Sequence, residues 1–241
     1  MQNLPPPKPS HEDALRGPLV PRRGSRAYLA FEFIALFVLV PGILVLDRQA
    51  FGQRIIPTLV LVGALCLGIL LRDSGFERRL LWNPSALRSQ LPALLRRLFL
   101  GSALLGLGLL VLEPDLLLSF PRHAPRTWIL VLLFYPLLSA YPQELIFRTF
   151  LFHRYRGLLR SDRQRIVASG VAFALAHLFF SNWIAALLSL GGGLLFARTY
   201  AHSRSTLLTT VEHGLWGDAL FTIGLGWYFY GGSIGTQALP R

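Results

Sequence analysis

The feature that most constrains this chain is a series of apolar runs, each long enough to cross a lipid bilayer. A membrane-spanning helix needs roughly 20 predominantly apolar residues, and a soluble fold has no use for several such runs within 241 residues. Hydrophobic residues make up 53% of the chain and charged residues 15%. We therefore expect an all-α, polytopic transmembrane bundle, which leaves no room for a second folded domain.

The apolar runs predict about seven spans in a single transmembrane domain, residues 27–241, which follows a disordered cytoplasmic leader, residues 1–26. The leader is rich in proline and has no periodic apolar pattern, as is typical of disordered segments. A basic loop, residues 72–97, is expected between the second and third spans, unless Arg96 and Arg97 belong to a longer third helix and their side chains reach back to the membrane surface. The expected spans are residues 28–46, 55–71, 98–112, 128–152, 166–180, 182–196 and 206–230.

Arginines gather in alternate connections between these runs: in the leader, in the loop 72–97, and after the fourth and sixth spans. Because basic loops stay in the cytoplasm, this alternation predicts a cytoplasmic N-terminus. The formal charge of +12 is then a matter of topology. Lys8 is the only lysine, and the arginines form no stripe interleaved with aromatic residues. We therefore expect membrane lipids as partners and no nucleic acid.

Ionisable side chains inside the C-terminal spans are the second constraint, because each one costs about 2.5–3.5 kcal/mol on insertion scales. Three spans from separate parts of the sequence carry them, and a shared polar cavity explains all three at once. Polar residues scattered for structural reasons are the alternative. The residues are Gln143, Glu144 and Arg148 in the fourth span, His177 in the fifth, and Glu212, His213 and Asp218 in the seventh.

Two imidazoles and a carboxylate can hold and deprotonate a water molecule. The carboxylate would act as the base, and the imidazoles would stabilise an oxyanion or, with a carboxylate, bind a divalent metal. Both routes predict hydrolysis of an amide or ester within the membrane. The spacing of His177 and His213 matches no short zinc motif. No cofactor is firmly implied, and a zinc ion on these two residues stays open.

The segments that carry these residues resemble the CPBP family of intramembrane proteases. These are the CAAX-protease and bacteriocin-processing (Abi) proteins, relatives of the Ras-converting CAAX endopeptidase. The family pattern is E-E-x-x-x-R, then F-x-x-x-H, then H-x-x-x-N or H-x-x-x with a similar polar residue. Here it corresponds to QELIFR at residues 143–148, FALAH at residues 173–177, and a last polar span that contains His213. The resemblance covers about residues 130–230.

The resemblance implies a glutamate-type intramembrane protease, often described as a metalloprotease, in a bacterial inner (plasma) membrane. Such an enzyme would cleave a membrane-associated protein or peptide near the cytoplasmic face. Glu144, His177 and His213 would form the site, with Gln143 holding a water and Arg148 orienting Glu144. Phe173 belongs to the second motif and is a secondary candidate.

Two positions depart from the family pattern. Gln143 replaces the first glutamate, and an amide cannot accept a proton at neutral pH. Gly217 stands where the family usually has asparagine, so Asp218 or Glu212 is expected to supply the missing polar group. In addition, Glu144 and Arg148 lie four residues apart, where an ion pair is expected and would make the carboxylate a weaker base.

Three interpretations of Gln143 follow. The chain is an active protease in which Glu144 or Glu212 is the working carboxylate, a pseudoprotease that acts as a membrane binding or scaffold protein, or an inactivated variant of an active enzyme. A small-molecule transporter is a weaker alternative, because transporters favour internal repeats and the two halves of this chain are not similar.

Overall fold

The computed structural model describes residues 25–229 and shows only helices and their connections within them. The first helical rod consists of α2 (Arg26–Ile34), the π-helical η1 (Ala35–Leu39) and α3 (Val40–Leu46). The expected leader lies outside the described residues, except that Ser25 caps α2 and Arg26 begins it. The next elements are α4 (Arg48–Phe51), η2 (Gly52–Arg54), α5 (Ile55–Arg72), η3 (Arg78–Leu80) and α6 (Pro84–Leu112).

The C-terminal half begins with the short η4 (Pro114–Leu116) and α7 (Ser119–His123). A long rod follows, made of α8 (Pro125–Tyr135), η5 (Pro136–Ala140), α9 (Tyr141–Glu144), η6 (Leu145–Phe150) and α10 (Leu151–Arg154). The remaining elements are α11 (Asp162–His177), η7 (Leu178–Phe180), α12 (Trp183–Ser203), α13 (Thr206–Ile223) and η8 (Leu225–Phe229).

Within residues 25–229, five helical stretches are long and apolar enough to cross a membrane: Arg26–Leu46, Ile55–Arg72, Arg78–Leu112, Pro125–Arg154 and Trp183–Ser203. The chain is therefore an all-helical integral membrane protein. The other two expected spans correspond to α11, which has 16 residues, and to the polar α13, and neither meets these limits of length and hydropathy. Seven spans and a cytoplasmic N-terminus stay predictions.

The expected loop 72–97 is wrong over its second half, because α6 begins at Pro84, well before residue 98. Asn83 caps this helix by accepting a hydrogen bond from the Ala86 backbone N–H at 3.3 Å. Proline is favoured in the first turn, where its missing N–H would have no helical partner. Arg96 and Arg97 therefore lie on a long helix and not in a loop.

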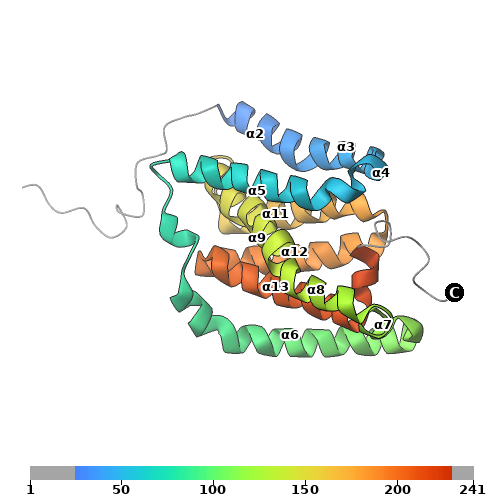
Figure 1. The fold of residues 1–241 in the computed structure, drawn as a ribbon. Coiled ribbons are helices and arrows are strands. Elements are labelled where there is room, and N and C mark those ends of the chain that lie inside the picture. Colours follow the sequence, from blue (N-terminus) through green and yellow to red (C-terminus); the bar gives the residue numbers. More distant parts are fainter. Residues whose placement is uncertain (1–24, 230–241) are drawn as a thin grey trace, which may run out of the picture.

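The bundle has an inner and an outer set of helices (Figure 1). In the most apolar window of each span, 11% of the residues of the first rod, 17% of α5 and 11% of the third span are buried. The corresponding share is 39% for the rod 125–154 and 44% for α12. Leu104 on α6 is 71% exposed and Leu46 at the end of α3 is 87% exposed. Exposed apolar side chains of this kind are suited to contact with lipid. The polar motifs lie on the inner, more buried helices, away from that surface.

The rod 125–154 carries the first motif between two π-helical turns, η5 and η6. Pro136 and Pro142 lie inside this rod, and proline removes a helical hydrogen bond and crowds the preceding turn. A π-helical turn takes up an extra residue and is frequent at functional sites. Ser169 on α11 donates a hydrogen bond to the carbonyl oxygen of Phe147 at 2.8 Å. The irregular turn is thus held against α11.

Polar contacts join the helices at the Arg154 end of this rod. Arg154 binds both carboxylate oxygens of Glu32 on α2, at 2.8 and 2.7 Å. His153 contacts the carboxylate of Asp73, beyond the end of α5, at 2.9 Å. The hydrogen bond with His153 lowers the pKa of Asp73. The first two helices are therefore attached to the central rod by charges, as well as by the aromatic cluster around Phe37 and Tyr155.

Close contact between α11 and α12 depends on Gly193. A Cβ atom at this position would lie 3.1 Å from the backbone of Gly170 and 3.2 Å from the Cβ of Phe173. We expect Gly193→Val to destabilise the fold by about 1–3 kcal/mol through overpacking, measured as reversible unfolding in mixed micelles. Gly191→Ala is the matched control, because a Cβ at Gly191 meets nothing within 4 Å. Equal stability of the two variants would contradict this packing.

Candidate active site

Three inner helices bring the predicted site residues together. The rod 125–154 supplies Glu144 and Arg148, α11 supplies His177, and α13 supplies His213. Side-chain caps set where the last two helices start: Ser161 forms a capping box with Gln164 at the start of α11, and Ser205 caps α13. These caps satisfy N–H groups that the first helical turn leaves unpaired.

Glu144 and Arg148 form the expected ion pair inside the protein. The Arg148 Nε lies 3.3 Å from the Glu144 Oε2, and both side chains are fully buried. The guanidinium also lies over the rings of Phe173 and Phe196, 4.5 and 5.6 Å from their centroids. The arginine charge is thus balanced by one carboxylate and two aromatic faces.

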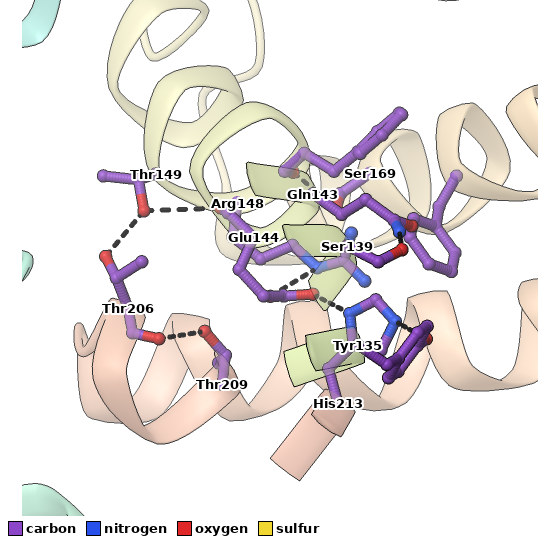
Figure 2. Close-up of polar contacts among 12 residues, drawn as sticks. Tyr135, Ser139, Gln143, Glu144, Arg148, Thr149, Ser169, Thr206, Thr209 and His213 are labelled. Carbon is purple, nitrogen blue, oxygen red and sulfur yellow. Dashed lines mark hydrogen bonds and ion pairs between the residues drawn. The ribbon is translucent and has the colours of Figure 1, made fainter. Parts of the chain in front are cut away.

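His213 is held on both ring nitrogens (Figure 2). Its Nδ1 lies 2.8 Å from the Glu144 Oε1, and its Nε2 lies 3.0 Å from the hydroxyl of Tyr135. Phe196 stacks on the imidazole, with ring centroids 4.7 Å apart. Because a carboxylate accepts hydrogen bonds, Nδ1 carries the proton towards Glu144. The result is a chain of polar contacts from Arg148 through Glu144 and His213 to Tyr135.

His177 has one ring nitrogen, Nδ1, hydrogen-bonded, and the other has no hydrogen-bond partner among residues 25–229. Its Nδ1 lies 2.7 Å from the Phe173 carbonyl oxygen, to which it donates. Nε2 of the neutral ring then carries a lone pair. The Phe173 ring contacts both imidazoles, with centroid distances of 4.4 Å to His177 and 5.4 Å to His213. The second motif therefore places one phenyl ring between the two histidines.

Gln143 turns away from this chain of contacts. Its amide nitrogen donates to the hydroxyl of Ser139, four residues earlier, at 2.8 Å (Figure 2). The side chain is buried, with 7% exposed. Gln143, the residue next to Glu144 in the sequence, is thus hydrogen-bonded within its own helix.

Neither residue expected to replace the missing asparagine is bound to His213. Glu212 pairs with Arg97 of α6 at 2.8 Å. Asp218 has a buried carboxylate oxygen, Oδ1, without a hydrogen-bond partner among residues 25–229. The polar group that meets His213 is Tyr135, which the sequence does not mark because it lies in an apolar run. Only the crossing of α8 and α13 reveals it.

A cavity of about 260 Å³ opens beside these residues. Tyr135, His177 and His213 line it, together with Ser189 and mostly apolar side chains. The lining residues include neither Glu144 nor Gln143. Apolar walls around a few convergent polar groups are typical of ligand sites.

The donor set around the cavity does not fit a zinc ion. Zinc sites need three or four ligand atoms, and both nitrogens of His213 are already bound to Glu144 and Tyr135. Within residues 25–229 no group of three or more His, Cys, Asp or Glu side chains is arranged to hold a metal. We therefore derive no step through a metal.

Removal of one charge should show how strongly the ion pair is coupled. Glu144→Gln leaves the Arg148 charge buried and uncompensated, and we expect a loss of about 3–5 kcal/mol of unfolding free energy. The double variant Glu144→Gln/Arg148→Met should lose less than the sum of its single variants. Reversible unfolding in mixed micelles measures all three. Glu77→Gln, in an exposed pair with Arg79, is the control and should change little. Additive losses would contradict the coupling.

Comparison with protein families matches residues 125–217 to the Rce1-like model, described as type II CAAX prenyl endopeptidase Rce1-like. No curated protein and no solved structure gives a significant match. The matched segment runs from the first residue of α8 to Gly217 and contains every residue of the contact chain. Over this segment, which contains the first two motifs and His213, the chain is similar to the family of type II CAAX prenyl endopeptidases.

Proposed function

We propose that this protein is an intramembrane endopeptidase that hydrolyses a peptide bond of a membrane-associated protein or peptide. The observation that carries the proposal is the apolar cavity into which His177, His213 and Tyr135 converge. Apolar walls exclude bulk water and strengthen each electrostatic contact with a substrate. The arginine-rich connections favour cleavage near the cytoplasmic face of a bacterial inner membrane.

His177 is the group that binds and activates the water. Its Nδ1–H is fixed on the Phe173 carbonyl, so the lone pair of Nε2 is available to a water in the cavity. As the water oxygen attacks the substrate carbonyl carbon, its proton passes to Nε2. The same proton then goes to the leaving amine as the carbon–nitrogen bond breaks. An imidazole can perform both transfers because the same ring nitrogen takes up and releases the proton.

Glu144 has a positioning role in this proposal. Both of its oxygens are engaged, one by His213 and one by Arg148, and the carboxylate does not line the cavity. Glu144 instead fixes the ring orientation and proton position of His213 beside the substrate.

His177→Ala should lower peptide hydrolysis at least 100-fold, because general-base catalysis contributes about 10²–10⁴ in rate. The assay uses purified protein in lipid nanodiscs and a library of membrane-anchored peptides, with products identified by mass spectrometry. His202→Ala is the matched control. His202 is exposed near the end of α12 and makes the same kind of contact, to the Arg198 carbonyl at 2.7 Å. Equal activity of the two variants would remove His177 from the mechanism.

A non-catalytic binding or scaffold function is the second candidate, and Gln143 favours it. The amide is held by Ser139 and cannot take a proton from water. On this hypothesis the wild-type protein cleaves no peptide, and Gln143→Glu gains activity in the same assay. Gln143→Ala controls for the loss of the Ser139 contact. Cleavage by wild-type protein, abolished in His177→Ala, would contradict the scaffold hypothesis.

A further inference from the structure

The ring of Tyr135 packs against the facing helix α13 at a position where only a glycine leaves room for it. A Cβ atom at Gly217 would lie 2.1 Å from Cε1 of the Tyr135 ring and 2.8 Å from its hydroxyl oxygen. These distances are far inside van der Waals contact. The ring therefore lies directly on the backbone of α13, one helical turn beyond His213.

The two partners of His213 limit what the imidazole itself can give to a ligand. Nδ1 is directed to Glu144 and Nε2 meets the Tyr135 hydroxyl. With the proton on Nδ1, Nε2 is an acceptor, so Tyr135 donates to it. The imidazole has no further proton for a substrate oxygen. The phenol, which also lines the cavity, is the donor at the end of the contact chain.

We propose that the hydroxyl of Tyr135 is the hydrogen-bond donor that binds the substrate oxygen as negative charge develops on it, and that Gly217 exists to admit its ring. In the resting protein the hydroxyl donates to neutral Nε2. Hydrogen bonds to an anion are about twice as strong as those between neutral groups. The hydroxyl therefore turns from His213 to the substrate oxygen when the tetrahedral intermediate forms, which stabilises the transition state more than the ground state.

The catalytic role of Tyr135 rests on the proposed function. Its ability to bind a negatively charged oxygen does not, because that can be measured by the binding of a charged mimic that is not hydrolysed. The probe is a blocked leucyl peptide phosphonate, whose anionic oxygen has the geometry of the tetrahedral intermediate. The corresponding uncharged peptide amide is the reference ligand. Both are titrated against wild-type protein and variants in lipid nanodiscs, and peptide hydrolysis is measured on the same samples.

Tyr135→Phe keeps the ring and removes only the hydroxyl. We expect it to weaken phosphonate binding about 10- to 100-fold, the range for one hydrogen bond to a charged group, and to leave amide binding unchanged. If the protein hydrolyses peptides, kcat should fall about 10²–10³-fold with little change in KM. Tyr141→Phe, on the same helical rod, is the matched control and should leave every value unchanged.

A second set of variants tests the role of Gly217 and guards against misfolding. Gly217→Ala should displace the ring and weaken phosphonate binding as Tyr135→Phe does. The exchange Tyr135→Ala/Gly217→Asn returns the asparagine of the family pattern and frees space for it. It should bind the phosphonate at least 10-fold more tightly than Tyr135→Ala alone.

Three results would overturn the assignment: no phosphonate binding by wild-type protein, equal binding by Tyr135→Phe, or equal weakening of phosphonate and amide. The last would make Tyr135 merely structural. Absence of peptide hydrolysis by wild-type protein, with the phosphonate result intact, would count against the proposed function and not against the oxygen-binding site.

Discussion

The buried contact between Glu144 and Arg148 is the constraint on which the rest of this structure depends. A guanidinium in an apolar interior must be balanced, and here one carboxylate and the faces of Phe173 and Phe196 do so. The carboxylate that neutralises the arginine also receives Nδ1–H of His213. Helices α11, α12 and α13 are thereby packed against the rod 125–154, because each supplies one side chain that contacts this ion pair.

The contacts that hold these charges inside the membrane also separate the positioning role of Glu144 from the role of the catalytic base. The Glu144 carboxylate contacts an arginine and a histidine and does not line the cavity, so in the proposed mechanism the base is a residue outside the contact chain. His177 is such a residue, since within the described part of the chain only one of its nitrogens is hydrogen-bonded, to the backbone carbonyl of Phe173. The replacement of a motif glutamate by Gln143 therefore does not remove the base of the proposed mechanism. Its amide binds Ser139, and the cavity is lined without it.

Much of this could be predicted from the sequence, and the rest could not for physical reasons. Apolar run length and the cost of buried charge point to the membrane helices and to Glu144, His177 and His213, and helical spacing predicts the Glu144–Arg148 pair. The start of α6 at Pro84 could not be predicted, because arginines in this segment are equally typical of a basic loop between spans. Tyr135 carried no signal, since its partner lies 78 residues away. The contact between Glu212 and Arg97 could not be predicted, because nothing local in the sequence indicates a pair between these two helices.

The ion pair between Arg97 and Glu212 connects the lipid-facing helix α6 to the candidate site. Helix α6 lies at the edge of the bundle (Figure 1). Many of its leucines are exposed. Helices of this kind adjust their tilt to the thickness of the surrounding hydrocarbon. Arg97 ties α6 to Glu212, the neighbour of His213 in the sequence. A thicker or thinner membrane would therefore act on α13 next to its histidine, so lipid composition belongs among the variables that set the geometry of this site.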